Sequence, residues 1–148
     1  MASKTASNTA NTVFGKCTSG AETATHFSIG TSSSGTGKLL FRKALASSVS
    51  ISANIRPQFD AGTLTVTTSG DISDAYQNQI LALMFNNTGI SLIGDSTGLP
   101  ASATDGNLYV GLHTADPGAS GSQTTNECAY TGYARVAIAR TSSGWTIA

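Results

Sequence analysis

Charged side chains are scarce in this sequence. They make up 11% of the 148 residues, with eight basic residues against eight acidic ones and a formal net charge of zero. A protein that follows a phosphate backbone or an anionic membrane surface needs a basic patch or stripe, and this composition does not favour one. Nucleic acid and membrane are therefore not expected as partners.

Cysteine is rarer still, with only Cys17 and Cys128 in the chain. A disulfide framework or a zinc cluster needs several closely spaced ligands. We expect two free thiols, with a single bridge between them as the alternative, and no metal or cofactor. The sequence also has no apolar run of about 18 residues and no N-terminal signal segment, so we expect no membrane span and synthesis in a cytoplasm.

Short stretches of alternating apolar and polar residues are present instead, and this alternation is typical of half-buried strands. The stretches are 27–29, 39–41, 49–51, 64–66, 108–112, 134–138 and 145–147. Turns rich in Gly, Ser and Thr separate them. Among the first four, a spacing of roughly 10 to 15 residues between strand centres predicts a mainly β domain, either a β-sandwich or a jelly roll.

One segment has helical periodicity. Between about 72 and 86 the apolar residues recur at intervals of three and four, which predicts one amphipathic helix. The apolar residues are Ile72, Ala75, Tyr76, Ile80, Leu83 and Met84. Asp71 or Ser73 is placed to cap the N-terminus of this helix, and Gly89 is placed to follow its C-terminus.

The first 24 residues are polar and small and show neither period. A segment of this kind cannot build a core of its own. We expect an extended N-terminal arm over residues 1–24, held by another chain through Val13 and Phe14, and a single domain over residues 25–148. This interpretation predicts that removing residues 1–22 leaves a folded domain.

The stretch SSSGTGKLL has some features of a phosphate-binding loop. Such a loop needs Gly, four residues, and then Gly-Lys-Ser/Thr, so that backbone N–H groups and the lysine converge on phosphate. Here Ser32 stands in place of the first glycine, and Leu39 stands in place of the hydroxyl residue. The mismatches favour a solvent-exposed hairpin loop.

The stretch LYVGLHTADPG brings His113 and Asp116 close together in sequence. A metal or catalytic site would need further groups, and His26, Glu127 and Cys128 are only loose candidates. Turn chemistry explains the Asp-Pro-Gly sequence, because Asp bonds its own backbone, Pro fixes φ and Gly supplies a positive φ. We therefore expect no catalytic or metal-binding residues, and we place His113 on the outward face of a strand.

Two motifs carry a resemblance to a known group of proteins. The helix AYQNQILALMF, followed by NLYVGLHTADPG, an Asn-Glu turn and YTGYARVAIAR, resembles a pattern found in tailed-bacteriophage structural proteins. The segment from ATHFSIG to TVTTSG is similar to a β-rich stretch that precedes this motif in some members. Such proteins are labelled tail fibre, minor tail or capsid decoration proteins. The resemblance implies a virion protein that is made in the cytoplasm of a bacterial host, and it implies no enzyme activity.

The sequence also bears on where in the virion the protein is expected. Fibres usually show heptads or repeats along a shaft, and neither is present here. We therefore expect a capsid decoration, or cement, protein that stabilises the assembled head lattice by mass action, with a tail or tail-fibre-associated subunit as the alternative. Its expected partners are the major capsid protein or other virion proteins, and copies of itself in a symmetric assembly.

Five residues are candidates for such contacts. Val13 and Phe14 belong to the expected arm, whereas Tyr109, His113 and Arg135 are expected on the outward faces of strands. A cell-wall hydrolase is a third class of function, and it needs two carboxylates in an acid/base arrangement. The only two glutamates of the chain lie in no recognisable context of that kind.

Overall fold

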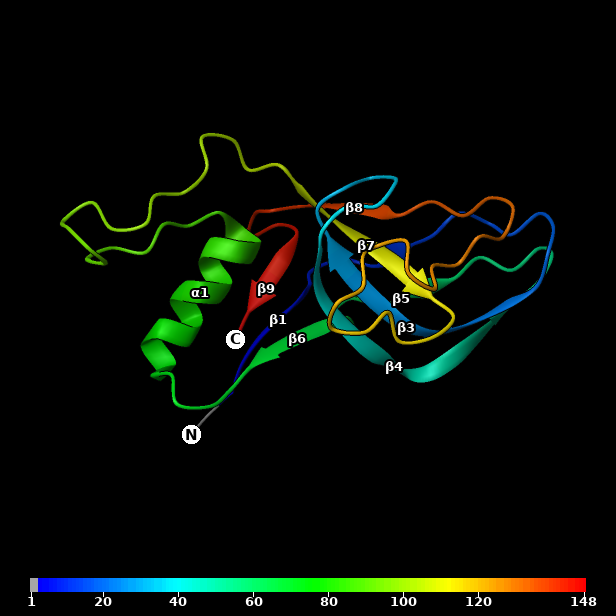
Figure 1. Ribbon diagram of the computed structural model, residues 1–148, viewed down its shortest axis with the longest axis horizontal. Coiled ribbons are helices and arrows are strands. Elements are labelled where there is room, and N and C mark those ends of the chain that lie inside the picture. Colours follow the sequence, from blue (N-terminus) through cyan, green and yellow to red (C-terminus); the bar gives the residue numbers. More distant parts are fainter. Residues whose placement is uncertain (1–2) are drawn as a thin grey trace. The chain divides into compact units, whose positions relative to one another are not determined.

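The structure is a computed structural model that describes residues 3–148, and its fold is mainly β with antiparallel sheets and one helix, as the sequence predicted (Figure 1). The elements in chain order are β1 (Lys4–Asn8), β2 (Thr12–Val13), β3 (Glu22–Gly30), β4 (Leu39–Ile51), β5 (Gln58–Phe59), β6 (Thr65–Thr68), α1 (Asp74–Asn86), β7 (Asn107–His113), β8 (Val136–Ala139) and β9 (Trp145–Ile147). In the described part of the chain, no helix has the length and apolar character needed to cross a membrane.

The chain divides into two compact units, each built from segments that are distant in sequence. The helical unit contains the described residues up to Asn11, together with Asp60–Asn107 and Ala139–Ala148. The sheet unit contains Thr12–Phe59 and Leu108–Ile138. The structure thus divides the chain differently from the expected arm over residues 1–24 and single domain over 25–148.

The first strand of the chain is the central strand of the helical unit. Its sheet has the order β6-β1-β9, and Ala6 pairs with Val66 on one side and with Ile147 on the other. Ala6 is fully buried. Residues 4–8, which were expected to extend to another chain, therefore have partners within their own chain. Their small side chains fit a strand with neighbours on both edges but produce no apolar alternation that the sequence could reveal.

Helix α1 begins and ends at polar caps. Of the two expected candidates, Asp71 and Ser73, the N-cap is Ser73, and its Oγ accepts a hydrogen bond from the N–H of Tyr76 at 3.3 Å. The C-cap is Asn87 in the left-handed conformation (φ 50°), and Gly89 follows the C-terminus of the helix, as expected. Asn tolerates this conformation better than most residues, and its side chain also bonds the backbone of Ser102.

The buried face of α1 is not the one that the periodicity indicated. The residues that the helix buries fully are Gln77, Leu81 and Phe85, and Phe85 packs against Trp145 of β9 with ring centroids 4.8 Å apart. Gln77 can be buried because its amide donates to the carbonyl of Ile72 and accepts from Thr68 Oγ1. The helix carries two apolar stripes, and packing against β1 and β9 selects this one.

Arg140 holds the C-terminal end of the same helix. Its guanidinium donates to the carbonyl oxygens of Met84 at 2.9 Å and Leu83 at 2.7 Å. The last carbonyls of a helix have no partner within the helix and carry partial negative charge, so a cation placed there stabilises them.

A four-stranded sheet with the order β4-β3-β7-β8 forms the sheet unit, together with the short pair β2-β5. Phe27 pairs with Leu112 and Ile29 with Val110, so the apolar residues of β3 and β7 share one face and are buried, as the alternation predicted. Strand β4 is one strand of 13 residues, not the two that the sequence indicated. A register shift between Ala24 and His26 of β3 explains why the alternation in β4 is interrupted.

Candidate functional site

The second face of the β3-β7 pair is polar and buried. Ser28 pairs with Gly111, and His26 pairs with His113, so these residues share the face opposite Phe27 and Leu112. Glu127 forms an isolated bridge with His113 and therefore belongs to the same face. Ser28 and His113 are fully buried. His113 was expected on the outward face of a strand; it does lie on the face opposite Leu112, but this face is not outward, because further segments cover this side of the sheet.

His113 is held through both ring nitrogens. Its Nε2 lies 2.6 Å from Ser28 Oγ, and its Nδ1 lies 2.8 Å from the carbonyl oxygen of Thr125. A carbonyl only accepts, so Nδ1 carries the proton and Nε2 accepts from the serine hydroxyl. Burial lowers the pKa of His113 below its ordinary value of 6.5, and the ring is neutral at physiological pH.

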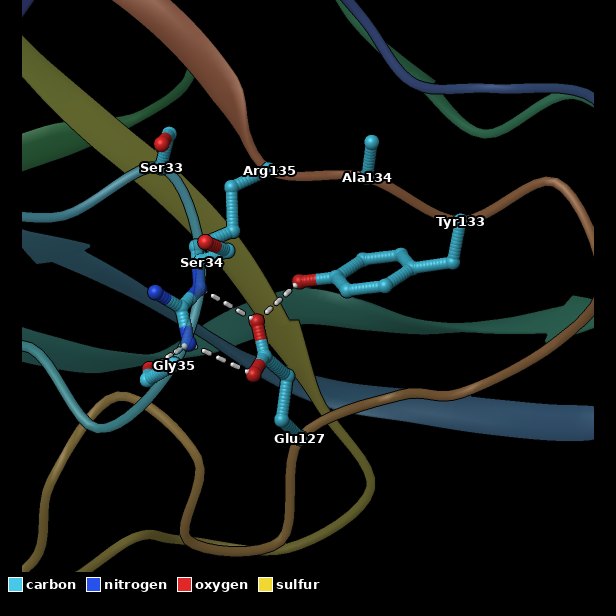
Figure 2. A pocket seen from close by; sticks show the side chains of 7 residues that line it. All are labelled: Ser33, Ser34, Gly35, Glu127, Tyr133, Ala134 and Arg135. Carbon is cyan, nitrogen blue, oxygen red and sulfur yellow. Dashed lines mark hydrogen bonds and ion pairs between the residues drawn. The ribbon is translucent and has the colours of Figure 1, made fainter.

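An ion pair lies beside this serine–histidine pair. The Glu127 carboxylate accepts from Arg135 Nε at 2.6 Å and from Arg135 Nη2 at 2.8 Å, and Tyr133 donates its hydroxyl to Glu127 at 2.8 Å. Figure 2 shows both side chains directed at the carboxylate. We call Glu127, Tyr133 and Arg135 the glutamate cluster. The bond to Glu127 raises the pKa of Arg135, and burial raises that of Tyr133.

Gly111 connects the two groups. A Cβ at this position would lie 3.2 Å from Ser28 Oγ, 3.3 Å from Tyr133 Oη and 3.5 Å from Glu127 Oε1. The absence of a side chain lets the glutamate cluster and the serine–histidine pair sit together against the sheet. The result is two hydrogen-bonded groups, the serine–histidine pair and the glutamate cluster, packed next to each other at Gly111.

The glutamate cluster and Gln123 also fix the loop between β3 and β4. Arg135 donates to the carbonyls of Ser32 at 2.9 Å and Gly35 at 2.7 Å, and Gln123 Oε1 accepts from the N–H of Ser32 at 2.9 Å. This loop contains most of the stretch SSSGTGKLL, which has some features of a phosphate-binding loop. It is a mostly exposed hairpin loop, as predicted, and the carbonyls of Ser32 and Gly35 are turned towards Arg135.

A pocket of about 260 Å³ opens beside the glutamate cluster. Figure 2 shows the lining residues, which are Ser33, Ser34, Gly35, Glu127, Tyr133, Ala134 and Arg135. The charged groups in this lining already bond each other or the loop backbone. The described residues contain no group of three His, Cys, Asp or Glu side chains placed to hold a metal ion.

The serine–histidine pair has the donor geometry of a nucleophile and its general base. Catalysis also requires that a substrate reach the hydroxyl, and both residues are fully buried. The arrangement therefore acts as an internal crosslink between β3, β7 and the segment that contains Thr125 and Glu127.

The five predicted contact residues have different surroundings. Val13 is 37% exposed and Tyr109 is half-buried, whereas Phe14 and His113 are fully buried. Phe14 stacks on Tyr133 at 6.2 Å, within the sheet unit. The Arg135 side chain is 3% exposed and pairs with Glu127. The structure thus places His113 in the serine–histidine pair and Arg135 in the neighbouring glutamate cluster, and it leaves Val13 on the surface.

The turn after β7 has the predicted chemistry. Asp116 Oδ1 accepts from the N–H of Gly118 at 2.9 Å, and Gly118 has a φ of +79°. This bond, together with an ion pair to Arg42 at 2.6 Å, lowers the pKa of Asp116. The two cysteines are free and buried, as expected, and burial raises the pKa of Cys128 to about 12.

Sequence reasoning missed three of the residues that form these contacts. Ser28 and Tyr133 drew no attention, and Gln123 sits in a polar turn whose composition indicates only a loop. An Asn-Glu turn and a Tyr-Thr-Gly-Tyr-Ala-Arg sequence contain no spacing that would predict a carboxylate accepting from both a tyrosine and an arginine. Only the pairing of β3 with β7 and the return of the chain place these residues together.

The chain was compared with known families, curated proteins and solved structures. One family model, described as Podophage GP4 fiber I protein gp80, matches residues 1–67 and 71–148. The searches of curated proteins and of solved structures returned no significant match.

Proposed function

The chain belongs to the podophage GP4 fiber I protein gp80 family, and on this basis we propose that it is a non-enzymatic structural subunit of a phage fibre. The protein is a phage structural protein, located in the virion and assembled in the host. The observation that supports the fibre assignment is the extent of the family match, which includes both units of the structure.

The family favours the alternative of the sequence analysis over its main expectation. The expectation of a capsid decoration protein depended on the lack of heptads and shaft repeats. A fibre can also contain small compact subunits without a repeated shaft, and the match is to a fibre family. Its partners in this proposal are other virion proteins and further copies of the chain.

The geometry of the serine–histidine pair and the glutamate cluster supports a structural role. The serine and histidine are sealed from solvent, and the arginine bonds a glutamate and two backbone carbonyls. These contacts tie a long hairpin loop to the sheet. They give a small domain a fixed surface, which is what a subunit needs for repeated contacts.

The proposal is tested by locating the protein on virions. Gold-labelled antibodies raised against the purified chain are expected to bind at fibres, and quantitative mass spectrometry of purified virions is expected to find few copies relative to the major capsid protein. Antibodies against the major capsid protein serve as the control. Label spread over the head with a copy number near that of the capsid protein would support decoration and contradict the proposal.

The non-enzymatic part has its own test. Purified protein incubated with host cell walls and surface polysaccharide is expected to release no sugar or peptide. If it does release them, Ser28→Ala and Glu127→Gln variants identify whether the serine–histidine pair or the glutamate cluster takes part.

A further inference from the structure

The two units carry opposite formal charge. The helical unit has five acidic residues against two basic ones, a net charge of −3, and the sheet unit has six basic residues against three acidic ones, a net charge of +3. The acidic residues of the helical unit are Asp60, Asp71, Asp74, Asp95 and Asp105. The neutral total is therefore the sum of two units of opposite net charge.

The helical unit presents an apolar loop. Leu92 is 80% exposed, the most exposed large apolar side chain in the described part of the protein, and Leu99 is 43% exposed. Ile90 and Leu99 form a bridge that closes the loop, and Asp95 lies within it. We call Leu92, Asp95 and Leu99 the loop patch.

Neither the backbone conformation nor the packing of residue 92 favours a leucine. Its φ is +65°, a conformation that Gly or Asn adopts more easily, and its side chain is not buried. The Asp95 carboxylate accepts from the N–H groups of Thr97 and Gly98 and makes no ion pair within the described residues. The loop thus holds an aliphatic side chain and an acidic group in the solvent.

The sheet unit has a surface of matching composition. Phe14 N–H donates to the Pro57 carbonyl and Cys17 N–H donates to the Ile55 carbonyl, so two short segments run side by side next to the β2-β5 pair. The exposed residues on these segments include Val13, Lys16, Ile55 and Arg56, which we call the ladder patch. Lys16 and Arg56 make no ion pair in the described structure.

We propose that the loop patch of one copy binds the ladder patch of a second copy. Leu92 and Leu99 would cover Val13 and Ile55, and Asp95 would face Lys16 and Arg56. Each surface combines aliphatic side chains with unpaired charge of one sign, and the signs are opposite. The contact is heterologous, so repetition closes a ring or extends a filament.

This contact deepens the proposed function, since it rests on the role of a repeated fibre subunit and supplies the contact between copies. It is measured on purified protein, so its failure would leave the location of the protein on virions unaffected. Antibody label found away from the fibres would in turn leave the measurement of self-association unaffected.

The first test is sedimentation of the full chain over a range of concentrations. The wild-type protein is expected to self-associate at low salt, and less strongly as added salt screens the charges. Leu92→Asn is expected to weaken association about tenfold or more, because the contact loses a buried leucine side chain. Asn suits the positive φ, so the fold is retained, and Leu92→Met is the matched control that keeps both apolar character and association.

The charges are tested separately. Arg56→Glu is expected to weaken association a few-fold at low salt, and this loss shrinks at high salt. Lys38→Glu makes the same charge change on an exposed lysine of the sheet unit outside the ladder patch and is expected to have a smaller effect. Equal losses in the two variants would overturn the assignment of Arg56 to the contact.

Mixing variants tests the pairing of the two surfaces. Neither Leu92→Asn nor the double variant Ile55→Asp/Arg56→Glu should self-associate appreciably. Their mixture should form a one-to-one complex, because each variant keeps the surface that the other has lost. A wild-type protein that remains monomeric throughout, or a mixture that does not pair while wild type associates, would overturn the proposal.

Discussion

Different interactions stabilise the interiors of the two units. The sheet unit contains two neighbouring hydrogen-bonded groups, the buried pair Ser28–His113 and the glutamate cluster. The helical unit packs Phe85 against Trp145 and is held at the ends of its helix by polar caps. A bonded network depends on protonation and on a few irreplaceable atoms, whereas a packed interior depends on volume and on a complete set of strands.

Loss of the first strand should give the largest difference in stability between the two units. Deleting residues 1–11 removes the strand that pairs with both β6 and β9, together with Asn8, whose side chain accepts from the Leu64 N–H. The helical unit should unfold while the sheet unit, which begins at Thr12, stays folded. Hydrogen exchange followed by mass spectrometry gives the result for each unit. Thr5→Ser is the control, and retained protection in α1 after the deletion would contradict this role of β1.

Glu127→Ala should give the next largest effect, confined to the sheet unit. It leaves the Arg135 guanidinium, 3% exposed, without its carboxylate, and breaking a buried pair in this way costs about 3–5 kcal/mol. Urea denaturation measures the loss. Arg42→Ala, which breaks the exposed pair with Asp116, should change stability much less. A similar loss of stability in both variants would show that the Glu127–Arg135 pair stabilises the protein no more than the exposed Arg42–Asp116 pair.

A fall in pH should lower the stability of the sheet unit relative to the helical unit, and this difference should be smaller. The pKa of His113 is lowered in the folded protein, so its stabilising effect is complete above about pH 6.5, the ordinary value of histidine. As the pH falls below this value, the unfolded chain binds a proton that the folded ring does not, and the sheet unit loses stability by no more than about 1.4 kcal/mol per pH unit.

Denaturation of the wild type and of His113→Asn between pH 7 and pH 5 measures this effect. The variant should lose the slope that the histidine causes. The lowered pKa of Asp116 acts separately, because its stabilisation is lost only as the pH falls through and below the ordinary value of 3.8. An unchanged slope in His113→Asn would contradict the role of the buried ring.

Loss of the helix cap should be the smallest change, confined to the helical unit. Ser73→Ala removes the Oγ that accepts from the Tyr76 N–H, and a lost N-cap typically costs about 1 kcal/mol. Ser73→Asp should keep the stability, since Asp caps equally well. Thermal denaturation with hydrogen exchange of α1 measures both, and a loss spread equally over the two units would contradict independent units.

Local patterns predicted much of the secondary structure. The alternation in LYVGLHT identified β7, the helical period identified α1, and Asp116 with Gly118 forms the predicted turn. Those features depend on neighbouring residues. The buried stripe of α1 depends on what the helix contacts, and its apolar residues Ile80 and Leu83 are only half-buried, whereas Gln77 is fully buried.

The candidate site was less accessible to sequence reasoning. Tyr109, His113 and Arg135 were placed outward because a strand alternates between faces, and that alternation is correct for β7. Alternation cannot tell whether the second face meets water or another part of the chain. Segments more than 80 residues from Ser28 cover it, so the polar face became an interior.

The sequence by itself determined the mainly β character, the positions of strands β3 and β7, the helix, and the turn at Asp116, because each depends on contacts a few residues apart. The tertiary structure alone decided that Ala6 lies in a central strand and that His113 is a neutral, buried residue. Both outcomes depend on which distant segments cover them, and burial is what sets the packing of the first and the pKa of the second.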